Sequence, residues 1–171
     1  FDAEIAPVTV AGRGGETLVT TDEPPGRIKI EKIPTLKPAF AKDGTVTAAS
    51  SSSISDGAAA LVLMRAETAT KLGSKPIARI VAHATHSHQP EWFTTAPIGA
   101  AQKVLAKAGW SKEDVDLWEV NEAFAVVPMA FMQELGVSHE VLNVNGGACA
   151  LGHPVGTTGA RLMATLIYAL Q

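Results

Sequence analysis

The spacing of hydrophobic residues changes along the chain and divides it into two parts. Up to Val10, apolar and polar residues alternate, which favours a strand or an extended arm. Glycines and prolines then crowd the stretch 12–26, which is typical of an irregular loop. From Pro76 onward, strand-like and helix-like spacings alternate. This order predicts a parallel or mixed sheet covered by helices, which is an α/β fold.

The second part carries signals for individual elements. Its predicted strands are short apolar segments at 77–81, 115–120 and 141–144. Its predicted helices are 96–108, 121–135 and one that begins near Pro154. Gly109 and Gly136 stand where the first two helices should end, because glycine readily adopts the conformation used at helix C-termini. Ser111 precedes a lysine and two acids, a pattern typical of a helix N-terminus.

A serine run separates two apolar stretches ahead of Pro76. Residues 45–49 are β-prone, and Ser50–Ser53 follow them. Four serines alone suggest a linker. The next residues, 54–64, are alanine-rich and strongly apolar, so they are unsuited to a solvated linker. They predict a buried helix that passes into a buried strand.

Composition narrows the class of protein. The 171 residues are enough for one compact domain, and 46% hydrophobic with 18% charged residues is ordinary globular composition. The net charge of −3 gives no electrostatic case for nucleic acid, and we expect no membrane span. A single cysteine excludes an internal disulfide and favours a reducing, cytoplasmic compartment. Phe1 reads as mid-chain and Gln171 stops within a helical pattern, so we expect a piece of a longer protein.

Two polar residues stand where a predicted strand gives way to a helix. Asn121 follows the 115–120 strand, and His153 follows the 141–144 strand and a turn with adjacent glycines. The carboxyl ends of parallel strands share one edge of a sheet, so we expect the two side chains to lie close together. An imidazole there could exchange protons near neutral pH. The plainer alternative is that both residues only cap helices.

Three histidines, His83, His86 and His88, cluster after the 77–81 strand. A metal site would need further ligands that converge with them. No carboxylate or cysteine accompanies them at ligand spacing. The sequence therefore favours a surface loop here and predicts no metal.

Several ordered blocks of the sequence resemble the signatures of the thiolases. GGACALGHPVGTTGARL at 146–162 is similar to their GGA-x-ALGHP-x-G-x-(S/T)-G-x-R pattern. TVTAASSSSISDGAAALVLM at 45–64 and NEAF at 121–124 resemble two further blocks, and FDAEIAPV with RIKIEKIP resembles their loop domain. Ser50 departs from the pattern, because many members carry Asn there.

The resemblance covers nearly the whole chain and implies a layered, thiolase-like α/β fold. It implies part of the loop domain and an entry strand at 1–49. The last helix and strand of the N-terminal half-domain would lie at 50–75. An incomplete C-terminal βαβαβ half-domain would occupy 76–171.

The resemblance also implies a reaction: reversible Claisen condensation and thiolytic cleavage of short-chain acyl-coenzyme A. Two acetyl-coenzyme A would give acetoacetyl-coenzyme A and coenzyme A. In the family's pattern, His153 takes the proton from the nucleophilic cysteine and holds the thioester oxygen. Asn121 orients a water that supplies a second donor, and Glu122 fixes that geometry from the next layer. Preorganised donors of this kind stabilise a developing oxyanion.

Other positions match substrate contacts of the family. The matched binding residues are Ser52 on the pantetheine arm, Phe93 near the acyl pocket, Phe124 in the NEAF block, and Arg27 and Lys32 at the nucleotide phosphates. The backbone turn is built by Gly146, Gly147 and Gly152. The plainer alternatives are an N-cap for Ser52, a core aromatic for Phe93 and a solvated face for the two basic residues.

The two reactive cysteines of the family would both lie outside these residues. Cys149 occupies a variable position of the signature, and we expect a buried neutral thiol there. The 171 residues alone should therefore not turn over substrate.

The expected partners are an acyl-coenzyme A substrate and further copies of the chain, as a dimer or tetramer, with no cofactor and no nucleic acid or membrane. The alternative function is a non-catalytic, thiolase-like carrier of acyl chains. A carrier needs neither paired oxyanion donors nor a cysteine upstream.

Overall fold

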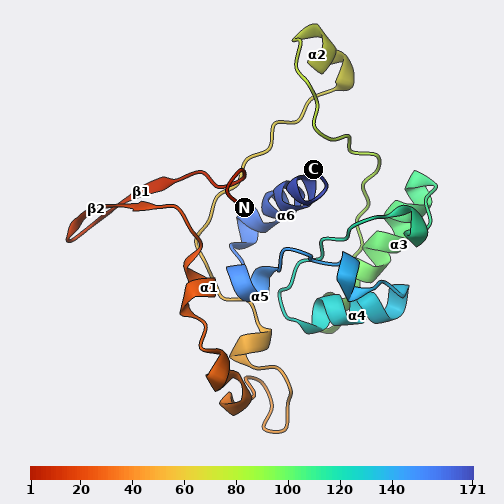
Figure 1. The fold of residues 1–171 in the computed structure, drawn as a ribbon. Helices are drawn as coiled ribbons and strands as arrows, with labels where there is room; N and C mark the ends of the chain where they lie inside the picture. Colours follow the sequence, from red (N-terminus) through yellow and green to blue (C-terminus); the bar gives the residue numbers. More distant parts are fainter.

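A β-hairpin opens the chain in the computed structural model, which describes residues 1–171. Strand β1 (Val8–Gly12) pairs antiparallel with β2 (Gly15–Val19), and the hairpin projects from the helices (Figure 1). The expected strand near Val10 is present, but its partner lies in the stretch predicted to be an irregular loop. The glycines there close a tight turn, and Gly15 has a φ of +109°.

Short elements and long connections follow the hairpin. They are α1 (Glu23–Arg27), the 3-10 helices η1 (Ile30–Thr35) and η2 (Ala48–Ser50), and α2 (Ala66–Lys71). Helix α2 sits at the tip of an extended excursion away from the other helices (Figure 1).

The segments at 54–64 and 77–81 contain no strand or helix, so the helix and the strands predicted there are wrong. Their apolar side chains are exposed, with Val62 at 88% and Ile77 at 70%. A strand is stable only when a neighbour satisfies its N–H and C=O groups, and no other segment of these 171 residues lies alongside them in a sheet. The apolar sequence therefore favours a strand here, but these residues contain no second strand for it to pair with.

The hydrophobic core lies between α3 (Ala96–Ala108), α4 (Val126–Leu135) and the segments that follow them. Its buried residues are Ala101, Val120, Val127, Phe131, Val137 and Leu142. Helix α3 has the predicted bounds, and Gly109 and Gly136 end α3 and α4 with φ of +70° and +62°. Helix α4 begins at Val126 rather than Asn121, because residues 123–125 pair with the serine run instead.

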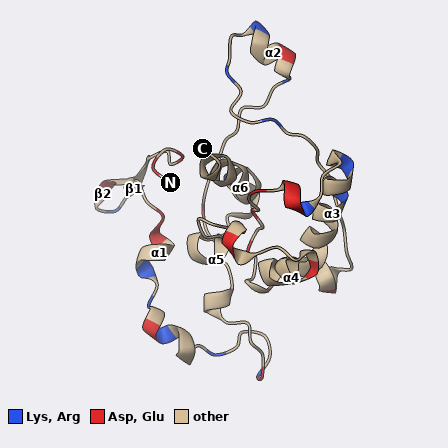
Figure 2. Ribbon diagram, turned by 45° about the vertical axis from the view of Figure 1, so that its right-hand side comes forward, with Lys and Arg blue, Asp and Glu red and all other residues tan.

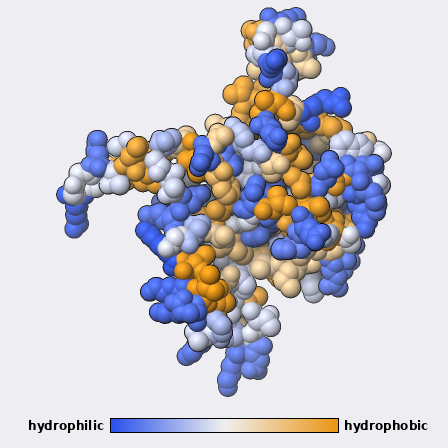
Figure 3. Space-filling model, in the orientation of Figure 1, coloured by the Kyte–Doolittle hydropathy of each residue, from blue (hydrophilic) through white to orange (hydrophobic).

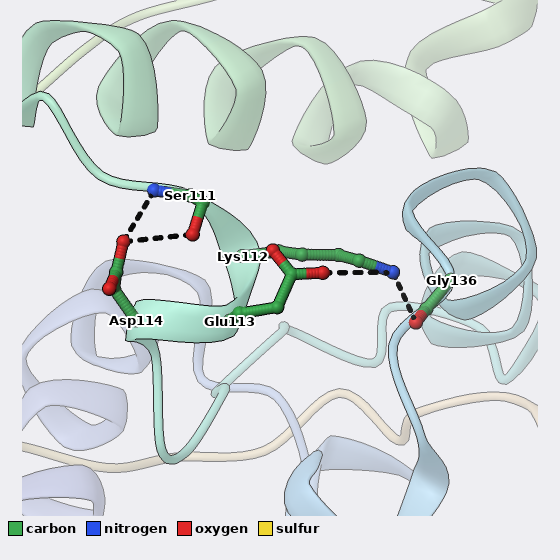
Figure 4. Close-up of polar contacts among 5 residues, drawn as sticks. All are labelled: Ser111, Lys112, Glu113, Asp114 and Gly136. Atoms are coloured by element: carbon green, nitrogen blue, oxygen red, sulfur yellow. Dashed lines mark hydrogen bonds and ion pairs between the residues drawn. The ribbon is translucent and has the colours of Figure 1, made fainter.

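A short 3-10 helix, η4 (Lys112–Asp114), joins this core, and Ser111 precedes it as predicted. A carboxylate oxygen of Asp114 accepts hydrogen bonds from the backbone N and the hydroxyl of Ser111, both at 2.8 Å (Figure 4). These bonds lower the pKa of Asp114. The ammonium group of Lys112 donates to the carbonyl oxygen of Gly136 at 3.0 Å, which ties η4 to the end of α4.

The predicted strands 115–120 and 141–144 lie side by side but pair only at one parallel bridge, between Trp118 and Leu142. Trp118 N donates to Val141 O and Asn143 N donates to Trp118 O, both at 2.8 Å. Helix α5 (Ala148–Leu151) follows, which the sequence did not predict, and then α6 (Val155–Ala169), which begins after Pro154 as predicted. No helix is both long enough and apolar enough to cross a membrane.

Both kinds of charge are interspersed along the ribbon, and neither sign gathers on one side (Figure 2). Hydrophobic residues reach the surface over the body of the molecule and near the base of the arm that carries α2 (Figure 3). The most exposed apolar side chains include Ile54, Val62, Ile30, Phe40 and Val155. Buried packing is therefore concentrated in the second part of the chain.

Candidate active site

Three segments that are distant in sequence meet around His153. The serine run pairs with the segment after Asn121, through an antiparallel bridge between Ser51 and Phe124. Ser52 N donates to Ala123 O at 3.1 Å. His153 N donates to Ser53 O at 2.9 Å, so the same serine run also holds the loop that carries the imidazole.

The side chains of Asn121 and His153 face each other, as the shared strand edge predicted. The amide nitrogen Nδ2 of Asn121 lies 3.4 Å from Nε2 of His153, and both residues are half-buried. The other ring nitrogen, Nδ1, lies 2.7 Å from the hydroxyl of Thr158. The imidazole is thus held from both sides.

The hydroxyl of Thr158 fixes which ring nitrogen carries the proton. That hydroxyl donates to the carbonyl oxygen of Pro154 at 3.0 Å, so toward His153 it can only accept. The neutral imidazole then carries its hydrogen on Nδ1 and a lone pair on Nε2, an assignment made from the hydrogen-bond network. The Nε2 lone pair faces the amide nitrogen of Asn121 across 3.4 Å, and it is the position at which the neutral ring can take up a proton.

The carboxylate of Glu122 joins the Asn121 segment to the glycine turn. One oxygen accepts from Nδ2 of Asn143 at 2.9 Å, and the other accepts from the backbone N of Cys149 at 3.1 Å. Gly147 lies directly against this carboxylate, and a Cβ at that position would collide with it. Glycine is therefore required at 147 for Glu122 to reach the start of α5.

Asn143 is a residue that the sequence argument missed. It is buried at 8% exposure and has a φ of +49°, which asparagine tolerates better than most residues. Its amide accepts from Val120 N at 2.8 Å and donates to Val120 O at 2.9 Å. The side chain thus continues the pairing that begins at Trp118, and an asparagine three residues before Gly146 was the available signal.

Gly152 shapes the backbone immediately before the imidazole. Its φ is +96°, and a Cβ there would meet the side chain of Ser55. A hydroxyl of α6 also contacts the serine-run side of the site, since Thr157 donates to the carbonyl oxygen of Gly57. The turn, the serine run and the start of α6 are therefore packed too closely to admit a side chain at 152.

Two family models match this chain. Residues 1–67 match the N-terminal domain of thiolase, and residues 74–171 match the C-terminal domain of thiolase. The chain belongs to the thiolase family.

Similar proteins include the probable acetyl-CoA acetyltransferase of Dictyostelium discoideum, 49% identical over 100% of this chain and 42% of that protein. The cytosolic acetyl-CoA acetyltransferase of Mus musculus is 48% identical over 100% of this chain and 44% of its own length. The chain thus spans well under half the length of these relatives.

Solved structures give the same family and fold. The acetyl-CoA acetyltransferase of Bacillus anthracis superposes with a TM-score of 0.95 and 46% identity, over 99% of this chain and 43% of that one. The Acat5 thiolase of Ascaris suum, solved in complex with coenzyme A, has a TM-score of 0.84 and 39% identity over 96% of this chain and 42% of that one. The predicted thiolase-like α/β fold is confirmed.

Cys149 lies in the thiolase signature beside Glu122. Burial raises its pKa to about 11, with further contributions from the charge of Glu122 and from a hydrogen bond to that residue. Its sulfur lies 3.7 Å from the carbonyl oxygen of Glu122. The thiol therefore stays protonated near neutral pH. Because only a thiolate is a good nucleophile, Cys149 is unsuited to that role.

The remaining predicted thiolase positions lie at different distances from the imidazole. Ser52 donates its hydroxyl to Ala123 O at 2.9 Å, and Phe124 stacks edge-on against Phe40 with ring centroids 5.7 Å apart. Arg27 ends α1, which lies against α5 (Figure 1), and it pairs with Glu23 at 2.8 Å.

Two other predicted residues are exposed. Lys32 is exposed on η1. Phe93 is 53% exposed on η3 (Pro90–Thr95), whose neighbours are α3 and α4 rather than the loop of His153.

The three clustered histidines lie on a loop beside α3. His86 and His88 stack edge-on with ring centroids 5.8 Å apart, and the ring of His86 packs against Gly99. Lys107 of α3 donates to the carbonyl oxygen of His83 at 3.1 Å. The structure groups no three His, Cys, Asp or Glu side chains in the arrangement that a metal ion needs.

Proposed function

We propose that this chain forms part of an acetyl-CoA acetyltransferase that condenses two acetyl-coenzyme A into acetoacetyl-coenzyme A and coenzyme A, and runs the reverse thiolysis. The observation that supports this most is the 3.4 Å approach of Nδ2 of Asn121 to Nε2 of His153. Relatives of that name at 45–50% identity support the same reaction.

His153 acts first as a base. A cysteine elsewhere in the whole protein gives its thiol proton to Nε2, because Nδ1 already carries a hydrogen toward Thr158. The thiolate attacks the thioester carbonyl, and the C–S bond to coenzyme A breaks as the tetrahedral intermediate collapses. The leaving thiolate of coenzyme A takes the proton back from Nε2, so the acyl-cysteine forms with no net change in protons.

Asn121 and His153 also stabilise the oxyanion. Once protonated, Nε2 can no longer accept from Nδ2 of Asn121, which lies 3.4 Å away, so both groups become donors available to an oxyanion or to a water beside it. Removing one preorganised donor from an oxyanion hole lowers the rate by about 10²-fold or more. Glu122 supports this arrangement by holding both Asn143 and the start of α5.

Residues that surround Asn121 and His153 would contact the rest of the substrate. Ser52 and Phe124 lie on the paired segments beside Asn121 and would contact the pantetheine arm. Arg27, on α1 against α5, and Lys32, farther along, would reach the nucleotide phosphates. Phe93 would close the acyl pocket, and the turn at Gly146, Gly147 and Gly152 brings the backbone near the thioester.

We further propose a homo-oligomer without a resident cofactor, located in the cytoplasm. The domain division at 49/50 and 75/76 completes the proposal. Named relatives include both cytosolic and mitochondrial proteins, so imaging of the tagged whole protein in cells would test the proposed compartment.

The test uses the whole protein in which these residues occur. Acetyl-coenzyme A is added, the reaction is quenched with acid, and mass spectrometry locates the acetyl group. The expected product is one acetyl-cysteine outside residues 1–171. His153→Ala should abolish it, whereas His88→Ala, which changes an exposed loop histidine, should leave it intact.

A loss of only a few-fold in His153→Ala would reduce that residue to a structural role. An unmodified protein that binds acyl-coenzyme A but never acquires an acetyl group would instead indicate an acyl carrier. The 171-residue chain alone should release no coenzyme A from acetoacetyl-coenzyme A above background.

A further inference from the structure

Helix α6 carries a buried polar stripe. Thr158, Arg161 and Thr165 are three and four residues apart, so they share one face of the helix. Thr158 and Thr165 are only 4% and 0% exposed. Two guanidinium nitrogens of Arg161 are also buried, and neither has a hydrogen-bond partner. A helix face of this kind must be matched by polar groups opposite it.

The segment that ends at Asn121 supplies those groups. Val120 points into the core at 6% exposure, so Glu119 and Asn121, at alternating positions, lie on the opposite side of the segment. Both carboxylate oxygens of Glu119 are buried without a hydrogen-bond partner. Asn121 already meets the imidazole that Thr158 holds, which places Glu119 one step farther along the same stripe.

The stripe has a matched group at its far end as well. The hydroxyl of Thr165 donates to a carboxylate oxygen of Glu4 at 3.3 Å. At one end of the stripe, Thr158 contacts His153, which in turn contacts Asn121. At the other end, Thr165 contacts Glu4. Between them stand a carboxylate and a guanidinium that are complementary in charge and in fork geometry. A buried charge without a partner is strongly unfavourable, whereas a paired one is tolerated.

In this structure the carboxylate and the guanidinium make no hydrogen bond or ion pair with each other, although the charge of Arg161 acts on Glu119. We propose that in the whole protein Glu119 and Arg161 close to an ion pair that fastens the Asn121 segment to α6 and so sets the distance between the Asn121 amide and the His153 imidazole. Both are positioning residues, because neither touches the reacting atoms. Their effect on the reaction rate rests on the proposed function, but the pairing itself does not.

The pair should respond to pH. Burial raises the pKa of Glu119 to about 7, Arg161 opposes that rise, and the charges of Glu122 and Glu4 add to it. These three are the charged groups that act on Glu119 from α6, from its own segment and from the N-terminus. The carboxyl is therefore neutral below about pH 7, and the charged pair exists only above it.

A double-mutant cycle in the whole protein tests the pair, with Glu119→Gln, Arg161→Gln and both together. We expect each single variant to lower kcat about tenfold with little change in KM, and the double variant to be no worse than either. Wild type should lose activity as pH falls through about 7, and Glu119→Gln, which carries no charge to lose, should show a smaller loss over the same range. Arg79→Gln, which changes an exposed arginine, is the matched control.

Two further outcomes overturn the pair. Additive losses in the cycle would show that the residues act separately, and a lower melting temperature with unchanged kcat would leave only a structural role. Arg161→Lys and Glu119→Asp keep the charges and should recover part of kcat, which covers the case of a Gln variant that does not fold.

A readout without turnover separates this inference from the proposed function. Carbon-13 NMR of the Glu119 carboxyl should show a higher pKa in Arg161→Gln than in wild type. If wild type has no acetyltransferase activity but this shift is present, the proposed function fails and the pair stands. If the pKa does not move, the pair is rejected whatever the activity.

Discussion

The two parts of the chain differ in how many of their hydrophobic residues are buried against other segments of these 171 residues. All but one of the 14 buried residues lie at or beyond Ala101, and they surround the elements that position Asn121 and His153. The apolar segments at 54–64 and 77–81 are just as hydrophobic but contain no helix or strand and are mostly exposed. Burial thus follows the presence of a partner within these residues rather than hydrophobicity alone, and the candidate site lies in the part that has its partners.

The largest difference between the two parts should appear in how much an alanine substitution lowers the free energy of unfolding. Leu142→Ala removes a side chain that is 2% exposed in the core, and should lower the free energy of unfolding by about 2–5 kcal/mol. Val62→Ala, at 88% exposure, should change it by less than about 0.5 kcal/mol in the 171-residue chain. Urea unfolding measures both, and equal losses would contradict the contrast.

The buried amide of Asn143 should give the next largest effect. Asn143→Ala leaves the N–H and C=O of Val120 without partners, which should reduce the free energy of unfolding by about 1–3 kcal/mol. Asn145→Ala, two residues on and exposed, should be nearly neutral. Chemical denaturation of the two variants in parallel gives the comparison. A neutral Asn143→Ala would show that this turn does not hold the site segment in place.

Thr158→Val tests how the imidazole is oriented. The variant keeps the shape of the side chain but removes the acceptor for Nδ1–H, so kcat of the whole protein should fall about tenfold, the value of one hydrogen bond. Nitrogen-15 NMR of the His153 ring should show a mixture of tautomers. Thr158→Ser retains the hydroxyl and should behave like wild type. An unchanged ring spectrum in Thr158→Val would refute the assigned tautomer.

A smaller effect should appear as a dependence of stability on pH. The folded-state pKa of Glu119 is about 7 against an ordinary 4.5, so the folded protein retains a proton that the unfolded chain has lost between these values. Stability from this carboxyl is therefore present below about pH 4.5 and is lost as pH rises through 7. Unfolding curves at pH 5 and pH 8 should differ less in Glu119→Gln than in wild type. A larger difference in the variant would reverse the predicted sign.

This loss of stability is compatible with the proposed ion pair. A buried carboxylate and guanidinium can stabilise the fold less than neutral groups would, while still fixing one geometry. Above pH 7, the pair would hold Asn121 in place at some expense of stability.

Local signals allowed two helices, α3 and the start of α6, to be predicted well from the sequence. Helix α3 has its predicted bounds because Gly109 fixes its end, and α6 starts after Pro154 because proline suits a helix N-terminus. Elements that depend on distant partners were predicted less well. Helix α4 starts late because Ala125 N donates to Ser50 O, a contact that no local pattern reveals.

The candidate site shows the same division. Asn121 and His153 were predicted to meet because two strand ends share an edge, and the parallel bridge between Trp118 and Leu142 brings those ends together. The sequence did not predict the contacts of Asn143 or the buried polar stripe of α6, because both depend on which groups turn toward the Asn121 segment. The chemical roles of the site residues stay proposals until activity is measured.

The most direct measurement is a crystal structure of the whole protein with a bound acyl-coenzyme A thioester. We expect the thioester carbonyl oxygen about 3 Å from Nε2 of His153, with a water held by Nδ2 of Asn121 as its second donor. A thioester bound with its carbonyl oxygen away from both side chains would contradict this expectation.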